Sequence, residues 1–325
     1  MSLPSLSMPA DWPALTGLDC LRLADFSPSD LTQLVRLGRE VKQLSALKVP
    51  FEPLRGSTLA MIFDKPSTRT RVSFAVGIHE LGGQALELDP STLQMARGES
   101  LEDTGRVLSQ FVDGIMMRTG SHEKLAQLAE AASVPVVNGL SDDFHPCQLL
   151  ADLLTLYERH GRLTGLAVAY VGDGSNMANS WIEAAALLGM GLRLATPPGY
   201  EPDPTLVAWG RALAARSGGS IHLSHDPREA VCGADAVYTD VWVSMGQEAE
   251  QAEREAAFAP YQVNRLLMQV AGPDAVFLHC LPAHRGLEVT DDVLDGPQSL
   301  VFEQAGNRLH AQKALLVSLL APRVR

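Results

Sequence analysis

Consecutive hydroxyl and guanidinium side chains form the clearest candidate for an anion site in this chain: Ser67, Thr68, Arg69, Thr70 and Arg71. They follow an apolar run, residues 59–63, which predicts a short buried strand. A helix that begins just after such a strand points unpaired backbone N–H groups and its positive dipole end at a bound anion. Arg69 or Arg71 could add bidentate hydrogen bonds to a phosphate. Taken alone, the run is equally compatible with a helix N-cap beside solvated arginines.

The segment His145-Pro146-Cys147-Gln148 is a second candidate for a functional site. Pro146 suits the first position of a helix, where its missing N–H costs nothing. His145 would then lie at the cap, with Gln148 on the same end of the helix. Together they could donate hydrogen bonds to a carbonyl oxygen or a developing oxyanion. The alternative is a capped connector helix with an ordinary histidine, and the nearby phosphate candidates favour the functional interpretation.

Polar residues also end other apolar runs that predict strands, and these are Arg118, Asn176, Asp240 and Cys280. Ligands of open parallel sheets bind outside the carboxyl ends of the strands. Each residue alone has a plain explanation; Arg118, for example, could simply face water. Their recurrence in both halves of the chain predicts one large cleft between two domains. The segment Ser244-Met245-Gly246 follows Asp240 and predicts either a loop that closes over a ligand or an ordinary linker.

Three other kinds of site fit the sequence poorly. His279 and Cys280 are neighbours on a predicted strand, so they point to opposite faces and His279 is poorly placed to activate the thiol. The spacing of His279, Cys280 and His284 is not that of a metal site. Met177 stands where a dinucleotide fingerprint needs its third glycine, and no acidic residue ends the next predicted strand. We therefore expect no metal and no NAD.

Composition narrows the class of protein. The chain has 325 residues, 46% of them hydrophobic, and a net charge of −12, which disfavours a nucleic-acid surface. No apolar run is long enough to span a bilayer, and the first 15 residues lack the pattern of a signal or transit peptide. The four cysteines are widely spaced, as expected for reduced thiols. We expect a cytoplasmic protein without nucleic-acid or membrane partners.

Apolar runs alternate with helical patterns along the chain, which predicts the α/β class: two doubly wound parallel-sheet domains with the active site in the cleft between them. The first domain is predicted at residues 1–145, joined by a C-terminal helix within 304–325, and the second at 146–303. Strands are predicted at 59–63, 84–88, 114–117, 134–137, 166–171, 193–195, 221–224, 236–239, 276–279 and 300–302. Helices are predicted at 29–44, capped by Ser29 or Asp30, and at 70–81, 101–111, 123–132, 146–160 and 304–320.

The assembled motifs resemble the aspartate/ornithine carbamoyltransferase superfamily, over about residues 21–322. Residues 67–71 and His145-Pro146-x-Gln148 are similar to the carbamoyl-phosphate signature that the whole superfamily shares. Asp240-x-x-x-Ser244-Met245-Gly246 and His279-Cys280-Leu281-Pro282 resemble the ornithine branch, and the aspartate branch lacks them. One departure stands out, because the family usually has Glu where this chain has Gly306, close to Arg308.

The resemblance implies a role for each matching residue. The phosphate would be held by Ser67, Thr68, Arg69, Thr70 and Arg118. The carbamoyl group would be bound by His145 and Gln148, with Cys280, Leu281 and Arg308 also facing carbamoyl phosphate. Ornithine would be held by Asn176, Asp240, Ser244 and Met245, and the catalytic residues would be Arg69, His145 and Cys280.

The implied reaction is transfer of the carbamoyl group to the δ-amino group of L-ornithine, without a metal or organic cofactor. The family is trimeric or built from trimers, so the resemblance implies a homotrimer in which Gln94 reaches into the neighbouring subunit's site. Alternatives are a carbamoyltransferase for acetylornithine, succinylornithine or putrescine, and a silent paralogue that serves as a binding subunit. Loss of Arg69, His145 or Cys280 would indicate the silent paralogue, and all three residues are present.

Overall fold

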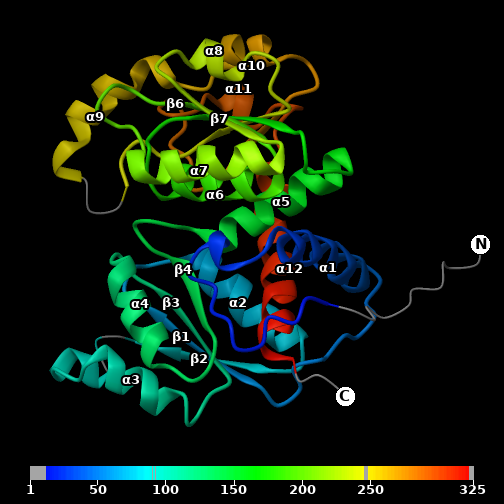
Figure 1. Ribbon diagram of the computed structural model, residues 1–325, viewed down its shortest axis with the longest axis vertical. Helices are drawn as coiled ribbons and strands as arrows, with labels where there is room; N and C mark the ends of the chain where they lie inside the picture. The colour runs from blue at the N-terminus through cyan, green and yellow to red at the C-terminus, as the bar shows by residue number, and fades with distance from the viewer. Residues whose placement is uncertain (1–11, 90, 92, 245–247, 322–325) are drawn as a thin grey trace, which may run out of the picture. The chain divides into compact units, whose positions relative to one another are not determined.

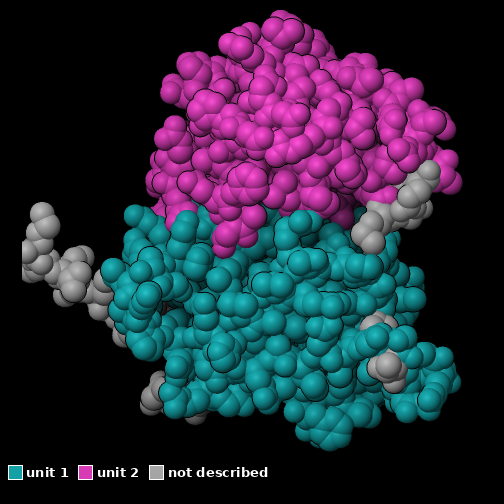
Figure 2. All heavy atoms as spheres, turned by 180° about the vertical axis from the view of Figure 1, so that it is seen from behind, with its two compact units in different colours: residues 1–154, 307–325 teal, residues 155–306 magenta. Residues whose placement is uncertain are grey.

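The computed structural model describes residues 12–89, 91, 93–244 and 248–321 (Figure 1). The chain divides into two compact units, drawn in different colours in Figure 2. Unit 1 comprises Met1–Leu154 and Asn307–Arg325, and unit 2 comprises Thr155–Gly306. The chain passes from unit 1 to unit 2 within helix α5 (Pro146–His160) and returns within helix α12 (Val301–Leu320).

Unit 1 is built on a four-stranded parallel sheet in the order β2-β1-β3-β4. Its strands are β1 (Thr58–Phe63), β2 (Gln84–Leu88), β3 (Gly114–Arg118) and β4 (Val136–Leu140). Its helices are α1 (Pro28–Ala46), α2 (Thr68–Glu80), α3 (Leu101–Leu108) and α4 (His122–Ala131), with short 3₁₀ turns η1 (Leu23–Asp25) and η2 (Gln94–Arg97). Because every crossover between these parallel strands is helical, both faces of the sheet can be covered.

Unit 2 carries a five-stranded parallel sheet in the order β7-β6-β5-β8-β9. Its strands are β5 (Ala167–Val171), β6 (Gly191–Ala195), β7 (Ser220–Ser224), β8 (Ala236–Thr239) and β9 (Val276–His279). Its helices are α6 (Asn176–Leu188), α7 (Pro204–Ser217), α8 (Pro227–Val231), α9 (Gln251–Phe258), α10 (Arg265–Ala271) and α11 (Asp291–Leu294), with turns η3 (Glu248–Glu250) and η4 (Ala259–Tyr261). The two parallel sheets confirm the predicted α/β class.

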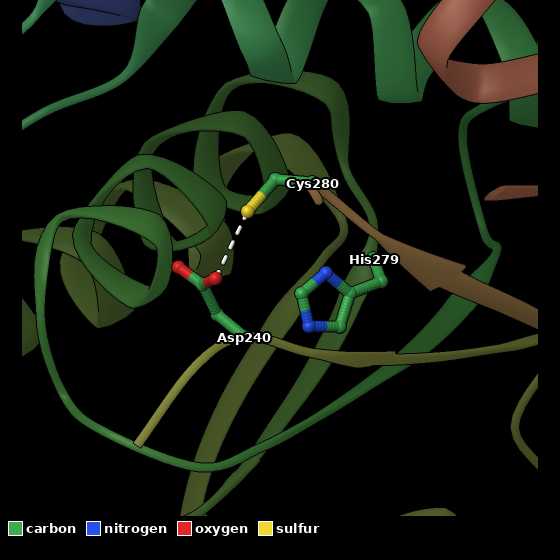
Figure 3. A group of neighbouring side chains, drawn as sticks. All are labelled: Asp240, His279 and Cys280. Atoms are coloured by element: carbon green, nitrogen blue, oxygen red, sulfur yellow. Dashed lines mark hydrogen bonds between the residues drawn. The ribbon is translucent and has the colours of Figure 1, made fainter. Parts of the chain in front are cut away.

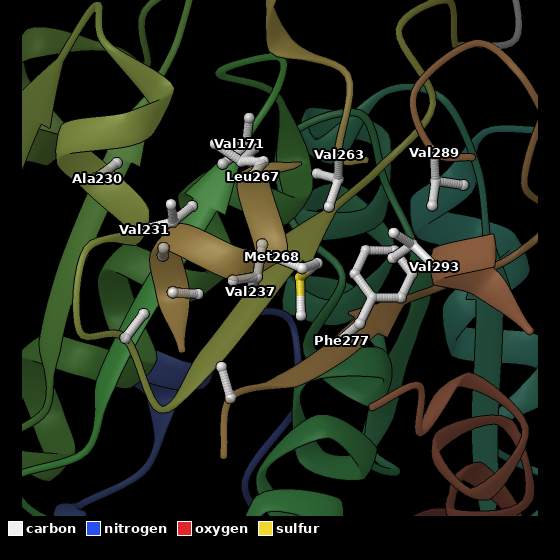
Figure 4. Close-up of a cluster of buried hydrophobic side chains, with 14 of the residues drawn as sticks. Val171, Ala230, Val231, Val237, Val263, Leu267, Met268, Phe277, Val289 and Val293 are labelled. Carbon is white, nitrogen blue, oxygen red and sulfur yellow. The ribbon is translucent and has the colours of Figure 1, made fainter. Parts of the chain in front are cut away.

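Alternating side chains place a core on each face of the unit 2 sheet. Figure 4 shows Val237 and Phe277 among side chains of α8 and α10. On the other face, the Tyr170 and Tyr238 rings stack with centroids 5.9 Å apart, and Trp181 of α6 meets Tyr238 edge-on at 5.5 Å. This alternation explains why adjacent residues of one strand serve different layers.

The C-terminal part of α12 belongs to unit 1. The Lys313 ammonium lies 2.6 Å from a carboxylate oxygen of Glu80 on α2 and 3.0 Å from the hydroxyl of Ser45 on α1. Gly38 of α1 also faces α12, since a Cβ there would lie in ordinary contact with the Cα of Ala311, at 3.6 Å. These contacts hold α12 beside α2, whose first turn carries the phosphate candidates.

The structure corrects two local predictions. Residues 300–302 were expected to form a strand, but α12 begins at Val301, and the carbonyl of Leu300 accepts a bond from the Gln304 N–H at 2.8 Å. A three-residue apolar run does not distinguish a strand from the first turn of a helix. The cap of α1 is Ser27 rather than Ser29 or Asp30, and Asp30 completes a capping box with it.

Among the described residues, no helix is long and apolar enough to cross a membrane.

Replacement of Gly306 by alanine tests how much a glycine inside α12 costs in stability. Gly306 is an exposed residue inside this helix, and a Cβ there would meet nothing within 4 Å. Gly306→Ala should therefore raise the free energy of unfolding by about 0.5–1 kcal/mol, measured by urea denaturation.

A matched control is Gly189→Ala at the end of α6. Gly189 has φ +67°, and its Cβ would lie 2.5 Å from the Ser217 carbonyl oxygen. This variant should lose about 1 kcal/mol or more. A loss of stability in Gly306→Ala would contradict the assignment of Gly306 to an unconstrained helical position.

Candidate active site

Neighbouring strands of unit 1 end beside one another and bring the phosphate candidates together. In the sheet, Phe63 of β1 lies opposite Arg118 of β3, and Arg118 lies opposite Leu140 of β4. The chain after β1 enters α2 at Ser67, whose hydroxyl accepts the Thr70 backbone N–H at 3.3 Å. The N-cap that the sequence allowed as an alternative is present, at Ser67, and it leaves the other N–H groups of the first turn at this edge.

The buried hydroxyl of Thr70 is the meeting point of two arginines. Its Oγ1 accepts from Nη2 of Arg308 at 2.9 Å and from Nη1 of Arg118 at 3.4 Å. Arg308 also donates from Nη1 to Oε1 of Gln148 at 3.2 Å. Thr70 and Arg308 are 0% and 3% exposed, so the contacts form inside unit 1. Two guanidinium groups beside a helix N-terminus create a region of positive potential.

His145 lies in this positive region and is 3% exposed. Burial lowers the pKa of its imidazole well below the usual value, and the charges of Arg308 and Arg118 lower it further. The ring is therefore neutral near pH 7, with one nitrogen as donor and the other as acceptor. A neutral imidazole can donate a hydrogen bond to a carbonyl oxygen without adding a third positive charge.

The remaining candidates of unit 1 are more open. Thr68 and Arg69 are exposed, and Arg69 makes no hydrogen bond or ion pair within the described part of the chain. Arg71 instead pairs with Glu87 of β2 at 3.0 Å and lies over the Phe63 ring. Gln94 lies in η2 with its side chain exposed. Of the two arginines in the run, only Arg69 is left with its side chain uncommitted.

In unit 2, adjacent strand ends bring together the second group of candidates. Asn176 is the first residue of α6, just after β5, and Asp240 follows β8 directly. Cys280 follows β9, and its Sγ donates to Oδ1 of Asp240 at 2.9 Å (Figure 3). Asp240 is 9% exposed, and burial raises the pKa of its carboxyl, while the neighbouring His279 and the Cys280 contact oppose this rise. Because β8 and β9 are neighbours in the sheet, the residues that follow them, Asp240 and Cys280, come together.

His279 is held by bonds that leave no link to the Cys280 thiol among the described contacts. Its Nδ1 accepts the Leu281 backbone N–H at 2.8 Å, so its proton lies on Nε2, 3.3 Å from Oε1 of Glu288. Glu288 also accepts the backbone N–H of His284. Leu281 has φ +57°, an uncommon conformation for a branched residue. His279 and Glu288 therefore shape the turn that carries Cys280 and Leu281.

One ligand atom each from Asp240, His279 and Cys280 lies within 4.8 Å of the others (Figure 3). Such a trio could in principle hold a soft divalent metal. The lone pair of His279 Nδ1 already faces the Leu281 N–H, and the Cys280 thiol donates to Asp240. A metal would have to replace both bonds, so the arrangement fits a hydrogen-bonded binding site better than a metal centre.

Ser244 and Met245 are the remaining ornithine candidates, and two further residues support the candidates already described. Ser244 is half-buried after Asp240, and Met245 lies outside the described residues. Sequence reasoning missed Asp152, fully buried, whose carboxylate accepts from Nε2 of Gln148 at 2.8 Å. Their four-residue spacing on α5 is a signal that could have found it. It also missed Glu288, for which the loop sequence offers no periodic signal.

Comparisons with known proteins identify the family to which the chain belongs. Residues 19–158 match the model described as "Aspartate/ornithine carbamoyltransferase, carbamoyl-P binding domain", and residues 164–319 match "Aspartate/ornithine carbamoyltransferase, Asp/Orn binding domain". An ornithine carbamoyltransferase of Anoxybacillus flavithermus is 57% identical over 94% of this chain and 98% of its own length. The chain belongs to the aspartate/ornithine carbamoyltransferase family.

Solved structures of the family share the fold. The ornithine carbamoyltransferase of Pyrococcus furiosus has a TM-score of 0.92 at 52% identity, over 95% of this chain and 99% of that one. That of Thermus thermophilus has a TM-score of 0.82 at 45% identity, over 93% of this chain and 98% of that one. The predicted resemblance is therefore confirmed at the level of the family and of the fold.

The protonation state of His145 can be measured directly. With its pKa well below the usual value, the ring should stay neutral as the pH falls from about 8 to about 6. NMR of protein labelled with ¹⁵N-histidine, with His145→Gln to assign the signal, should show no titration in this range. Arg308→Met should raise the pKa by removing one charge. A wild-type midpoint at 6.5 or above would contradict the assignment.

Proposed function

We propose that this family member transfers the carbamoyl group of carbamoyl phosphate to the δ-amino group of L-ornithine, giving L-citrulline and phosphate. The observation that carries the proposal is the meeting of Arg118 and Arg308 on the buried Thr70 hydroxyl, at the N-terminus of α2 and near His145. The near-full-length relatives named ornithine carbamoyltransferase support the choice of acceptor. A relative from Pyrococcus furiosus is named anabolic, which supports a role in arginine biosynthesis.

Unit 1 would bind carbamoyl phosphate. Phosphate oxygens accept hydrogen bonds from the first turn of α2, from Ser67 and Thr68, and from the guanidinium groups of Arg69 and Arg118. The carbamoyl group takes its hydrogen bonds from a second set of side chains, namely His145, Gln148, Thr70 and Arg308. Gln148 suits this role because its carbonyl faces Arg308 and one amide N–H faces Asp152, which fixes the plane of the amide and leaves its second N–H.

Unit 2 would bind L-ornithine. Asn176, at the N-terminus of α6, would receive the α-carboxylate, where backbone N–H groups and the helix dipole favour an anion. Asp240, Ser244 and Met245 would hold the amino groups. The Asp240 carboxylate can accept N–H bonds from an amine and so orient its lone pair. Cys280 and Leu281 would line the reacting centre, with the thiol as a hydrogen-bonding group rather than a covalent nucleophile, because it donates to Asp240.

The chemical step follows from these roles. Near neutral pH an alkyl ammonium costs roughly 4–5 kcal/mol to deprotonate, so the site must bind the neutral amine. The nitrogen lone pair then attacks the carbamoyl carbon, and the carbonyl π electrons move to oxygen. Arg69, His145 and Thr70 stabilise this oxyanion. The C–O bond to phosphate breaks as the carbonyl re-forms, phosphate leaves with the bonding pair, and the surplus proton passes from nitrogen to phosphate or solvent.

A panel of four amines tests the identity of the acceptor. Purified protein with carbamoyl phosphate should use L-ornithine with kcat/KM at least about 100-fold above acetylornithine, succinylornithine and putrescine. Each alternative leaves a buried polar group of the site unpaired or adds an acyl group to the α-nitrogen. The readout is the carbamoylated product of each reaction, and a higher kcat/KM for any other amine would overturn the choice of ornithine. No product from any of the four would indicate a silent paralogue.

The proposed assembly is a homotrimer, or a multiple of trimers, in which Gln94 completes the neighbouring subunit's carbamoyl-phosphate site. The exposure of Gln94 in η2 supports this, because its side chain is available to a second copy of the chain. A closed ring of head-to-tail subunits would then place each Gln94 at the next site.

Mixing two weakened variants tests this sharing. Gln94→Ala and Arg69→Ala should each lose most activity, since each removes a phosphate contact. After subunit exchange at equal amounts, about a quarter of the sites in random trimers should combine an intact Arg69 with a neighbour's intact Gln94, and activity should recover accordingly. Arg69→Ala mixed with Arg118→Ala, both changed in their own sites, should show no recovery. Absence of recovery in the first mixture would contradict the role of Gln94.

A further inference from the structure

Arg254 of α9 is a buried cation that the proposed reaction does not use. It is 4% exposed, and each of its guanidinium nitrogens has a partner. Nη2 lies 2.5 Å from Oδ2 of Asp173, Nε donates to the Trp242 carbonyl oxygen at 2.6 Å, and Nη1 lies 3.5 Å from Glu250. These partners offset the cost of burying its charge.

The two closest partners belong to the two loops that carry the proposed ornithine ligands. Asp173 follows β5 and lies three residues before Asn176. Trp242 follows β8 and lies between Asp240 and Ser244 in the sequence. One side chain therefore ties the loop after β5 to the loop after β8, within unit 2.

Aromatic rings hold Arg254 itself in place. Its guanidinium carbon lies 4.9 Å from the ring centroid of Tyr200 and 5.4 Å from that of Phe258, both within range of a cation–π contact. The Tyr200 and Phe258 rings meet edge-on with centroids 4.8 Å apart. The two rings thus form an aromatic wall on one side of the cation.

The loop that carries Asp173 also rests directly on backbone. The Gly174 N–H donates to the Tyr200 carbonyl oxygen at 2.9 Å, and a Cβ on Gly174 would lie 2.3 Å from the Pro202 nitrogen. Since backbone atoms cannot rotate away, the loop has one available position against this segment. Asp173 is therefore presented to Arg254 by a fixed loop, whereas the segment after Asp240 contacts α9 through the Trp242 carbonyl oxygen.

A buried ion pair of this kind is weak evidence for stability, because desolvation offsets most of the attraction. Its better-attested use is to fix one arrangement of the groups it joins. We propose that Arg254 is a positioning residue for the amino-acid substrate: it holds the Asn176 loop and the Asp240–Ser244 segment in the geometry that binds ornithine. This inference rests on the proposed function and adds the residue that sets the spacing of its acceptor site.

The test begins with Arg254→Met, which keeps the length and apolar stem of the side chain but removes the guanidinium group. At about pH 8.5, where the Asp173 carboxyl with its burial-raised pKa of about 6 is ionised in wild type, the KM for ornithine should rise about tenfold or more. The KM for carbamoyl phosphate should stay within about twofold, because the residues proposed to bind it lie mainly in unit 1.

The double variant Asp173→Asn with Arg254→Met separates positioning from stability. Arg254→Met alone leaves an unpaired buried carboxylate and should lower the urea midpoint, whereas the double variant should recover most of that loss. If Arg254 acts by positioning, the KM for ornithine stays raised in the double variant. If the KM returns to the wild-type value together with the stability, the inference is overturned.

A matched control keeps this result distinct from the proposed function. Arg193 of unit 2 also donates to a backbone carbonyl, that of Cys232 at 2.6 Å, but lies on β6, away from the two ornithine loops. Arg193→Met should leave both KM values within about twofold of wild type. If wild-type protein forms no citrulline, the proposed function fails. If wild type is active and Arg254→Met keeps its KM for ornithine, only the positioning role fails.

Discussion

All strands of a parallel sheet must end at the same edge, and the rest of this structure depends on that constraint. In each unit the backbone ladder fixes which strand ends are level, with Phe63 opposite Arg118 in one sheet and Thr239 opposite His279 in the other. Polar residues just beyond these positions therefore lie close together at one edge of the sheet. The backbone hydrogen bonds of the sheet therefore bring side chains from distant parts of the sequence within hydrogen-bond distance of one another.

A second effect is the way in which hydrogen bonds orient the cations that gather in unit 1. Arg308 donates to Oγ1 of Thr70 and Oε1 of Gln148, and both acceptors are neutral oxygens. Such bonds orient a guanidinium group but do not cancel its charge. The neutral state of His145 fits the same pattern, because burial and two nearby arginines both oppose its protonation. The neutral imidazole therefore adds no positive charge beside Thr70, where Arg118 and Arg308 already meet.

Much of this could be predicted from sequence, because strand ends and helix starts are local signals. The start of α2 after Ser67 and the start of α5 at Pro146 were predicted correctly. A hydroxyl cap and a proline in the first helical turn can both be recognised from a few neighbouring residues. The strand expected at 300–302 failed because a short apolar run suits either element. Arg254 was not predicted because its partner Asp173 lies 81 residues away in the sequence. Glu288 lies only nine residues from His279, but in a loop whose sequence offers no periodic signal.

The discontinuity of unit 1 has a consequence for the order in which the protein is made. Met1–Leu154 leave a ribosome first, yet Asn307–Arg325 belong to the same compact unit, and Arg308 is the partner of Thr70. A nascent chain therefore carries the hydroxyl, the helix start and His145 long before it carries the guanidinium group that bonds to Thr70. Unit 2 lies wholly between these segments in the sequence, so it can fold before the last segment of unit 1 is made. The anion site is thus the last part of the molecule to become complete.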